Sequence, residues 1–276
     1  MSTNKIKTFK LKKKLGQHLL TDVNVLDHII KATNINKDIT VLEIGPGTGE
    51  LTIKLAPLCK NIISVEIDNS LKNHLEKLKT DFPNLNIIYN DILKTKLSDI
   101  LQADEQNIVV ANIPYYITSP IIMKLLENKN LFRSIFLTVQ KEVAKRVTAK
   151  KGSKDFGILT LAVEIEADTE YIFDISKNSF QPPPEVESAF IRIIPKNKDK
   201  YESNKQLMLK LIKKSFSQRR KKISNTLKAL FEKNQNIKIL LSDSGIDPDM
   251  RPEDLSLEDY FNLATSEPLR QALLKE

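Results

Sequence analysis

Short apolar runs alternate with segments of helical periodicity between residues 39 and 140. The apolar runs are nearly continuous, as expected of strands whose two faces are both covered in a parallel sheet. The predicted strands span residues 39–44, 61–66, 86–90, 107–111 and 134–140. The predicted helices between them span residues 49–58, 70–80 and 120–127. Strands and helices that alternate in this way predict an open α/β sheet domain.

The last part of the chain has only helical patterns. Before it, the sequence predicts helices at 141–150 and 157–166 and strands at 169–175 and 187–194. Pro195 and the polar residues 196–204 are typical of a linker. The helices predicted after this linker span residues 206–216, 219–233, 237–242 and 257–264. We therefore expect a sheet domain over residues 1–195 and a small all-helical domain over residues 196–276.

Composition excludes several classes of protein. The 276 residues are 41% hydrophobic and 28% charged, and no apolar run approaches the roughly 20 residues of a membrane-spanning helix. A single cysteine, Cys59, excludes a disulfide framework, and the three histidines have no metal-ligand spacing. The start of the chain lacks the apolar core of a secretory signal. We expect a cytoplasmic protein with no membrane segment and no metal.

The positive charge is concentrated in two segments. The net charge is +8; residues 1–14 contain six lysines and no acid, and residues 205–238 contain eleven basic residues and one acid. Such segments favour a polyanionic partner, although lysine-rich faces are often only solvated. Residues 1–14 are expected to form a flexible basic arm, while an organellar address stays open. The candidate RNA-contacting residues are Lys12, Lys13, Lys14, Arg219, Arg220, Lys221 and Lys222.

Candidate nucleotide-binding residues lie where the predicted strands end, which is where open α/β sheets bind ligands. The first strand runs into Glu43-Ile44-Gly45-Pro46-Gly47-Thr48-Gly49-Glu50. Its glycines permit a tight turn and let the backbone approach a ligand closely. Glu50 stands where the dinucleotide fingerprint needs its third glycine, and no Gly-Lys-Ser/Thr follows, which excludes a P-loop.

Carboxylates stand at the ends of the next two predicted strands. Glu66 could accept hydrogen bonds from both hydroxyls of a ribose, and Asp91 could accept one from an adenine amine. Either acid alone could be a helix cap. Together with the glycine loop, however, they suit a nucleoside ligand without phosphates. The pattern resembles the Rossmann-like class I methyltransferases, which implies their fold and S-adenosylmethionine as the cofactor.

The tetrapeptide Asn112-Ile113-Pro114-Tyr115 follows the fourth predicted strand. The side-chain oxygen of Asn112 and the carbonyl of Pro114 could each accept one N–H of an adenine N6 amine, drawing its lone pair back onto nitrogen. Tyr115 could stack on the base, a contact worth about 1–3 kcal/mol. Phe180, which precedes three consecutive prolines, could form an opposite aromatic wall. The alternatives are a proline turn after a buried strand and a rigid connector with a buried phenylalanine.

From about Lys14 to Ala264 the chain resembles the ribosomal RNA adenine N6-dimethyltransferase family. Residues 15–22 are similar to the family's Gly-Gln-Asn/His-Phe-Leu segment, which folds over the cofactor, with Leu19 where phenylalanine is usual. Residues 180–189 match the family's Phe-x-Pro-x-Pro-x-Val-x-Ser segment. The residues that these likenesses place at the cofactor are His18, Leu20, Glu43, Gly45, Gly47, Glu66, Asp91 and Asn112.

Two later segments, residues 216–222 and 251–260, resemble the branch of the family that acts on the small ribosomal subunit and is linked to kasugamycin sensitivity. The resemblance implies dimethylation of N6 on two adjacent adenosines near the 3′ end of small-subunit rRNA. It also implies a part in small-subunit biogenesis, an immature small subunit as partner and a monomeric protein. The alternatives are the large-subunit enzymes of macrolide resistance and a ribosome-assembly factor that binds nucleic acid on the same fold.

Overall fold

The structure is a computed structural model that describes residues 17–103, 106–196, 200–230 and 237–275. The described chain forms two compact units. The sheet unit holds the described residues up to Lys141 together with Ile172–Arg192. The helical unit holds Glu142–Tyr171 and the described residues from Ile193 onward. The candidate RNA-contacting residues Lys12, Lys13 and Lys14 lie outside the described residues.

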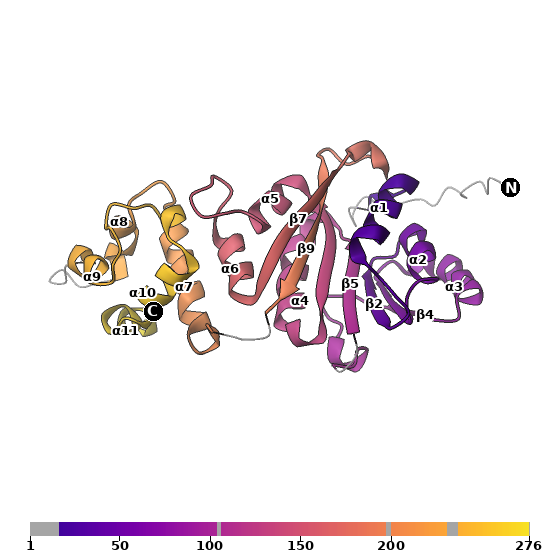
Figure 1. The fold of residues 1–276 in the computed structure, drawn as a ribbon, viewed down its shortest axis with the longest axis horizontal. Coiled ribbons are helices and arrows are strands. Elements are labelled where there is room, and N and C mark those ends of the chain that lie inside the picture. The colour runs from indigo at the N-terminus through magenta and orange to yellow at the C-terminus, as the bar shows by residue number, and fades with distance from the viewer. Residues whose placement is uncertain (1–16, 104–105, 197–199, 231–236, 276) are drawn as a thin grey trace. The chain divides into compact units, whose positions relative to one another are not determined.

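The predicted strands belong to a seven-stranded sheet with the order β4-β3-β2-β5-β6-β9-β7 (Figure 1). Its strands are β2 (Ile39–Ile44), β3 (Asn61–Glu66), β4 (Leu85–Tyr89), β5 (Gln106–Asn112), β6 (Ser134–Gln140), β7 (Ala167–Ile175) and β9 (Ser188–Pro195). The four pairs from β4 to β6 are parallel, which confirms the predicted parallel sheet at this end. Strand order reverses at β2, which pairs with both β3 and β5, and open sheets bind ligands at such a switch point.

The strand bounds follow the apolar runs. β2, β3 and β6 begin and end at the predicted residues, and every residue of β2 is buried. Burying an aliphatic side chain such as Val41 or Leu42 contributes about 1.5–3 kcal/mol, so these strands form a rigid base for the loops that follow them. The helices of the sheet unit are α1 (Val23–Thr33), α2 (Glu50–Leu55), α3 (Lys72–Asp81) and α4 (Thr118–Glu127).

Helix α1 is absent from the elements that we predicted. The side chain of Asp22 caps its first turn by accepting hydrogen bonds from two backbone amides. Leu26 and Ile29 bury the inner face of the helix. An aspartate followed by apolar residues three positions apart is a helix-start signal, so the sequence does contain the information for α1.

A short two-stranded sheet connects two segments that are far apart in the sequence. β1 (Leu19–Leu20) pairs antiparallel with β8 (Phe180–Gln181), and Leu20 lies opposite Phe180. Both of these side chains are buried in the core of the sheet unit. The pairing therefore holds the segment around His18 beside the segment that follows Phe180.

The helical unit has its own apolar core. Its helices are α6 (Ile158–Glu166), α7 (Lys205–Phe216), α8 (Ile223–Leu227), α9 (Ile237–Asp243), α10 (Leu257–Thr265) and α11 (Glu267–Leu274), and α5 (Lys141–Val147) begins at its boundary. Leu161 and Ile165 of α6 share this core with Leu211 of α7 and Leu263 of α10. The unit therefore includes α6, although we placed residues 157–166 in the sheet domain. Helix α11 is also additional to the predicted elements.

The helix predicted over residues 219–233 begins later than expected. Residues 219–222 form a turn, because Lys222 has an extended ψ of 147°, and α8 starts at Ile223. The backbone amide of Ile223 donates to the carbonyl of Met250 at 2.7 Å, and the guanidinium of Arg219 bonds elsewhere in the unit. These tertiary bonds replace the helical bonds of the first predicted turn. Residues 231–233 lie outside the described part of the chain.

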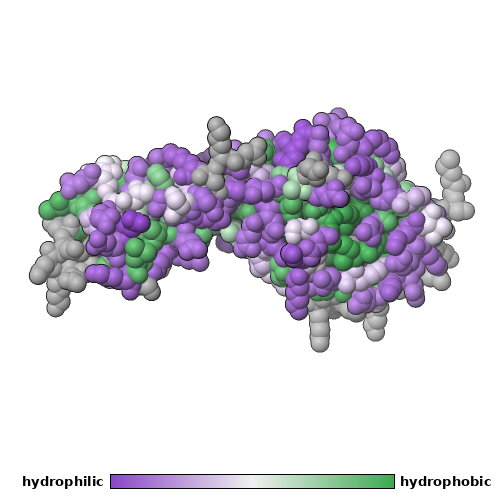
Figure 2. Space-filling model, turned by 90° about the horizontal axis from the view of Figure 1, so that it is seen from below, coloured by the Kyte–Doolittle hydropathy of each residue, from purple (hydrophilic) through white to green (hydrophobic). Residues whose placement is uncertain are grey.

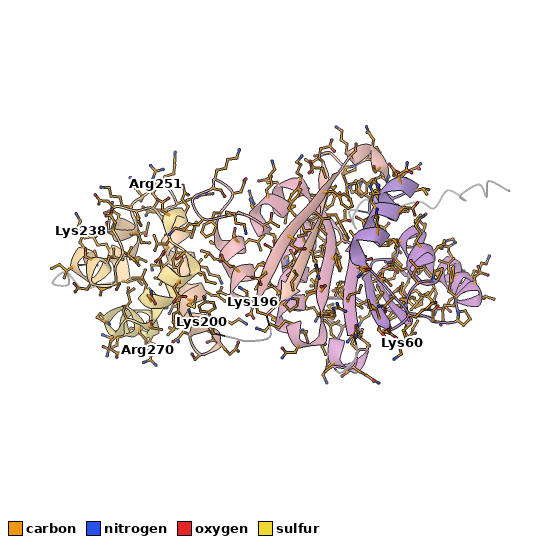
Figure 3. All side chains as sticks on the ribbon, viewed as in Figure 1. Lys60, Lys196, Lys200, Lys238, Arg251 and Arg270 are labelled. Carbon is orange, nitrogen blue, oxygen red and sulfur yellow. The ribbon has the colours of Figure 1, made fainter. Side chains whose placement is uncertain are left out.

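The surface is mainly polar. Hydrophilic residues cover most of the face drawn in Figure 2, and hydrophobic residues gather chiefly on the sheet unit. Lys238, Arg251 and Arg270 are exposed on the helical unit (Figure 3). None of the helices in the described residues has the length and apolarity that crossing a membrane requires.

Candidate active site

A cavity opens at the carboxyl ends of the parallel strands, where the sequence places its candidate residues. The segment before α1 and the turn after β5 complete its wall. The predicted residues that line it are His18, Gly45, Gly47, Glu66, Asp91, Asn112, Pro114 and Tyr115. Adjacent parallel strands end at one edge of the sheet, so the topology brings these residues together. Leu20, Glu43 and Phe180 are outside the lining.

Gly47 and Gly49 have backbone conformations that only glycine adopts readily, with φ of 59° and 90°. A Cβ on Gly47 would lie 2.7 Å from Cδ2 of Leu19, and one on Gly49 would lie 2.4 Å from Cδ1 of Leu78. A side chain on Gly47 would therefore displace Leu19, which also lines the cavity, so glycine at this position preserves the shape of the cavity wall.

Glu66 stands at the end of β3 with its carboxylate held by backbone amides. Oε1 accepts from the amide of Asp68 at 2.7 Å, and Oε2 accepts from the amide of Gly47 at 3.2 Å. Burial raises the pKa of Glu66, and the two amides oppose that rise. Each oxygen keeps a lone pair that can accept from a ligand hydroxyl at the cavity wall.

Glu43 lies behind the glycine loop. Its side chain is 1% exposed, and Oε2 accepts from the hydroxyls of Thr52 and Ser64, each at 2.7 Å. Burial raises the pKa of Glu43 to about 7, although both hydroxyls lower it. The carboxyl group links β2, α2 and β3 beneath the cavity. A direct cofactor contact from Glu43 stays a prediction.

The sequence patterns do not single out two isoleucines that line the cavity. Ile67 and Ile92 each follow a strand-end acid, Glu66 and Asp91 respectively, and both line the cavity. Ile67 is 50% exposed, whereas Ile92 is 5% exposed. Asp91 accepts from the amide of Leu93 at 2.9 Å, which fixes the turn after β4. The cavity therefore offers apolar surfaces for a planar base next to carboxylates for its polar edges.

On the other side of the cavity, Asn112 ends β5. Its side-chain Nδ2 donates to the backbone carbonyl of His18 at 2.8 Å. Because a carbonyl can only accept, this bond assigns the amide orientation and leaves Oδ1 as the acceptor. Pro114, two residues later, presents a carbonyl that accepts from the amide of Ile117 at 3.3 Å and lies 3.5 Å from the hydroxyl of Thr118. That hydroxyl also lies 3.2 Å from the carbonyl of Tyr115, and with its single hydrogen given to Tyr115 the Pro114 carbonyl can still accept from a ligand.

The ring of Tyr115 is fixed at two points. Its hydroxyl lies 2.6 Å from Oγ of Ser188, and its ring stacks on the imidazole of His18 with centroids 5.7 Å apart and planes inclined by 18°. Burial raises the pKa of Tyr115. Tyr116, the next residue, also lines the cavity but is 60% exposed at its surface.

Phe180 does not reach the cavity in this structure. It is 2% exposed and lies in the core of the sheet unit with Leu20, its partner in the β1–β8 pair. Strand pairing places both apolar side chains in the core, outside the cavity lining. The ring that stacks on Tyr115 is that of His18.

The four candidate RNA-contacting cations of the helical unit have different surroundings. Nε of Arg219 bonds Oε2 of Glu253 at 2.5 Å, and its NH2 donates to the carbonyl of Lys154 at 2.6 Å. Lys222 pairs with an exposed aspartate, whose pKa it lowers. The other two, Arg220 and Lys221, are exposed and have no ion pair within the described chain. Arg219 is therefore committed to the fold of the unit, and Arg220 and Lys221 stay available to a polyanion.

No group of three or more His, Cys, Asp or Glu side chains in the described residues could hold a metal ion.

The sheet order and the polar edge at its switch point define a Rossmann-like class I methyltransferase fold with an added helical region. Within that class, the chain belongs to the ribosomal RNA adenine dimethylase family, whose model matches residues 8–267. This match covers the sheet unit and nearly all of the helical unit. The family, the fold and the methyltransferase class that the sequence predicts are confirmed.

Individual relatives are similar over almost their whole length. The chain is 42% identical to the "Ribosomal RNA small subunit methyltransferase A" of Fusobacterium nucleatum, covering 92% of this chain and 97% of that protein. It is 37% identical to the protein of the same name from Clostridium botulinum, covering 93% and 94%. A dimethyladenosine transferase from Plasmodium falciparum superposes with a TM-score of 0.78 at 29% identity, covering 92% and 98%. The 23S rRNA methyltransferase ErmE has a TM-score of 0.69 at 23% identity, covering 92% and 99%, and shares the fold.

Proposed function

We propose that this protein transfers methyl groups from S-adenosylmethionine to N6 of two adjacent adenosines near the 3′ end of small-subunit rRNA. The observation that carries the proposal is the orientation of the Asn112 amide, whose bonded Nδ2 leaves Oδ1 as an acceptor on a residue that lines a cavity with a nucleoside-type wall. The names of the two bacterial relatives support the small subunit as the substrate. We further propose a role in small-subunit biogenesis in the cytoplasm, with the protein acting as a monomer.

The cavity residues fit the proposed cofactor. Gly47 lets Leu19 pack into the cavity wall where a Cβ would push it aside, and Glu66 presents a buried carboxylate already oriented by two backbone amides. Ile67 and Ile92 offer apolar surfaces suited to an adenine ring, and Asp91 lies beside them to accept from its amine. When bound, S-adenosylmethionine supplies a methyl group on a positively charged sulfur, which leaves as a neutral thioether.

The residues of the acceptor side can activate an adenine amine. The N6 lone pair is delocalised into the ring, so the amine is a weak nucleophile. The Oδ1 atom of Asn112 and the carbonyl of Pro114 each accept a hydrogen bond from one N–H group of the amine. These bonds favour the electronic structure in which the lone pair is localised on nitrogen. The new N–C bond leaves a cationic nitrogen, which then loses one proton to solvent. Tyr115 stacks on the extruded base and offsets part of the few kcal/mol that unstacking costs.

The second methyl transfer uses the same residues, but only one of the two hydrogen-bond acceptors is needed. After one methylation a single N–H remains, and either Asn112 or Pro114 accepts it. The bonded methyl group then occupies the space beside the other acceptor. The lone pair still faces the methyl donor, so no additional catalytic group is required for dimethylation.

The helical unit supplies a surface for the RNA backbone. Arg220 and Lys221 are exposed cations within a segment that contains a single acid among residues 205–238. Phosphate contacts of this kind position a nucleic acid without reading its sequence. We assign these two residues to rRNA binding.

The test is transfer of labelled methyl groups to purified small subunits that lack the modification, followed by mapping of the labelled bases. We expect label on two adjacent adenosines near the 3′ end, up to two methyl groups on each. Large subunits serve as the parallel substrate. Label confined to large-subunit RNA would replace the proposal by the macrolide-resistance type of enzyme, and binding of small subunits without transfer would favour an assembly factor.

A further inference from the structure

We propose that His18 is a positioning residue that assembles the acceptor side of the site. This inference rests on the proposed function, and it gives His18 a role distinct from the cofactor contact that the family resemblance implies. Three contacts carry it: the His18 carbonyl with Asn112, the imidazole with the carbonyl of Pro182, and the imidazole with the ring of Tyr115.

The first contact selects which end of the Asn112 amide faces the substrate. Nδ2 of Asn112 is 2.8 Å from the backbone carbonyl of His18. If the amide were turned over, two oxygens would face each other at that distance, and both would lose a partner. The backbone at His18 therefore keeps Oδ1 of Asn112 in the position that an adenine N–H needs.

The second contact anchors that backbone. Nδ1 of His18 is 2.8 Å from the carbonyl of Pro182, and because the carbonyl only accepts, Nδ1 carries the hydrogen. Pro182 directly follows β8, whose pairing with β1 aligns the segment that contains His18. The imidazole thus fixes the His18 carbonyl from the side of the proline-rich segment.

The third contact orients the stacking ring. The imidazole lies nearly parallel to the ring of Tyr115, and the hydroxyl of Tyr115 meets Ser188 at 2.6 Å. Ser188 and Pro182 belong to one stretch of chain. A closed circuit of contacts therefore runs from Asn112 through His18 and Pro182 to Ser188 and back to Tyr115. Removing the imidazole breaks this circuit next to both proposed acceptor residues.

The circuit also shows which residue supports the Tyr115 ring in place of Phe180. Phe180 was expected to provide the second aromatic ring, but it is buried with Leu20. His18 lines the cavity and contacts Tyr115 directly. The residue that supports the stacking ring is thus contributed by the segment before α1, and the proline-rich segment acts through Pro182 and Ser188.

The test uses the full-length protein with His18→Ala and His18→Phe. We expect His18→Ala to slow single-turnover methyl transfer at saturating cofactor by about tenfold, because both acceptor groups lose their fixed positions. The cofactor Kd, measured by calorimetry, should change by less than the transfer rate does, since the Ile67 and Glu66 walls of the cavity are intact. His18→Phe retains a ring for the stack on Tyr115 but loses the bond to the carbonyl of Pro182, so it should recover only part of the rate.

The matched control is His28→Ala. His28 also contacts an aromatic ring, that of Phe173, with centroids 6.1 Å apart, but it lies outside the cavity lining. This variant should transfer methyl groups at the wild-type rate. Circular dichroism of each variant checks that the fold is retained.

A double-mutant cycle separates positioning from general loosening. His18→Ala combined with Tyr115→Leu should slow transfer by less than the product of the two single effects, because the rings act as a pair. A full product would overturn the inference, as would a wild-type rate in His18→Ala or an effect confined to the cofactor Kd. Failure of the wild-type protein to methylate small subunits would instead overturn the proposed function.

Discussion

The hydroxyl of Tyr115 lies 2.6 Å from Oγ of Ser188, a residue that is 73 positions later in the chain and fully buried. The bond ties the turn after β5 to the start of β9. It therefore joins the proposed stacking ring to the proline-rich segment, and a change at either end should reach the other.

We predict that Ser188→Ala slows methyl transfer by about three- to tenfold, since the Tyr115 ring loses one of its two anchors. The loss of one buried hydrogen bond should lower the free energy of unfolding by about 1 kcal/mol. Tyr115→Phe removes the same bond from the other side. Single-turnover rates of the two variants and their combination should agree closely, whereas additive effects would show that the bond does not connect them.

Glu43 gives the protein a specific dependence of stability on pH. Its pKa is about 7 in the folded chain against an ordinary value of 4.5. Below pH 4.5 both states hold the proton, so the free energy of unfolding is unaffected. As the pH rises toward about 7, the unfolded chain releases its proton first and stability falls, by roughly 3 kcal/mol in total.

Glu43→Gln keeps an oxygen for Thr52 and Ser64 but cannot ionise. We therefore expect the variant to be more stable than the wild type at pH 8 and equally stable near pH 4.5. Urea unfolding at several pH values measures the difference. Two parallel stability curves between pH 4.5 and 8 would contradict this role for the Glu43 carboxyl.

Gly47 should be required to keep Leu19 in its position in the cavity wall. Gly47→Ala carries about 1–2 kcal/mol of backbone strain at φ 59°, and its methyl group must also push Leu19 aside. Gly152→Ala is the matched control, because Gly152 has φ 80° and nothing within 4 Å of the added Cβ. Gly47→Ala should lose at least as much stability as Gly152→Ala, because only its methyl group contacts Leu19, and calorimetry should show weaker S-adenosylmethionine binding for Gly47→Ala alone. Equal cofactor affinity in the two would argue against a ligand beside Gly47.

The basic turn before α8 should separate into a folding role and a binding role. Arg219→Gln loses two bonds within the helical unit and should lower the free energy of unfolding by about 1 kcal/mol. Arg220→Gln and Lys221→Gln should leave stability unchanged. Each should reduce the slope of log affinity for rRNA against log salt by about one. Thermal melts and salt titrations test both statements, and an unchanged slope would return these cations to the class of solvated surface residues.

Much of the fold could be predicted because long apolar runs leave few alternatives. The run that ends at Ile44 and the run from Ser134 to Gln140 have the predicted bounds, and the acids and glycines that follow such strands necessarily gather at one edge. The isoleucines after Glu66 and Asp91 were within reach of the same logic. Each isoleucine directly follows, in the sequence, an acid at the end of a strand, and this position indicates a residue of the cavity wall.

Other features depend on contacts between distant residues. Phe180 lies in a two-residue strand, and only its partner Leu20 decides which side faces the core. In the sequence Arg219 is one of four consecutive cations with no feature that distinguishes it. Only the folded chain brings Glu253 beside it. The bond from Asn112 to the His18 carbonyl spans 94 positions and involves a backbone atom, for which no residue type is a sign. Local patterns therefore predict which part of the fold holds the candidate site residues. Contacts between distant residues determine which atom each of them presents to the cavity.

The bond between Asn112 and the His18 carbonyl allows a sharp test of the proposed chemistry. Asn112→Ala removes the side-chain acceptor and should abolish most transfer, by about a hundredfold or more if positioning is lost as well. Asn112→Asp is nearly isosteric and has two oxygens that could accept from the amine. It has no hydrogen to donate, however, so an oxygen would face the His18 carbonyl at about the 2.8 Å of the present bond.

We therefore expect Asn112→Asp to be almost as slow as Asn112→Ala, with both variants binding S-adenosylmethionine within about threefold of the wild-type Kd. Single-turnover assays on unmodified small subunits, with calorimetry for the cofactor, provide the comparison. Wild-type transfer by Asn112→Asp would mean that the orientation set by His18 is dispensable. Wild-type transfer by Asn112→Ala would remove Asn112 from the mechanism, because the carbonyl of Pro114 would then suffice to hold and activate the amine.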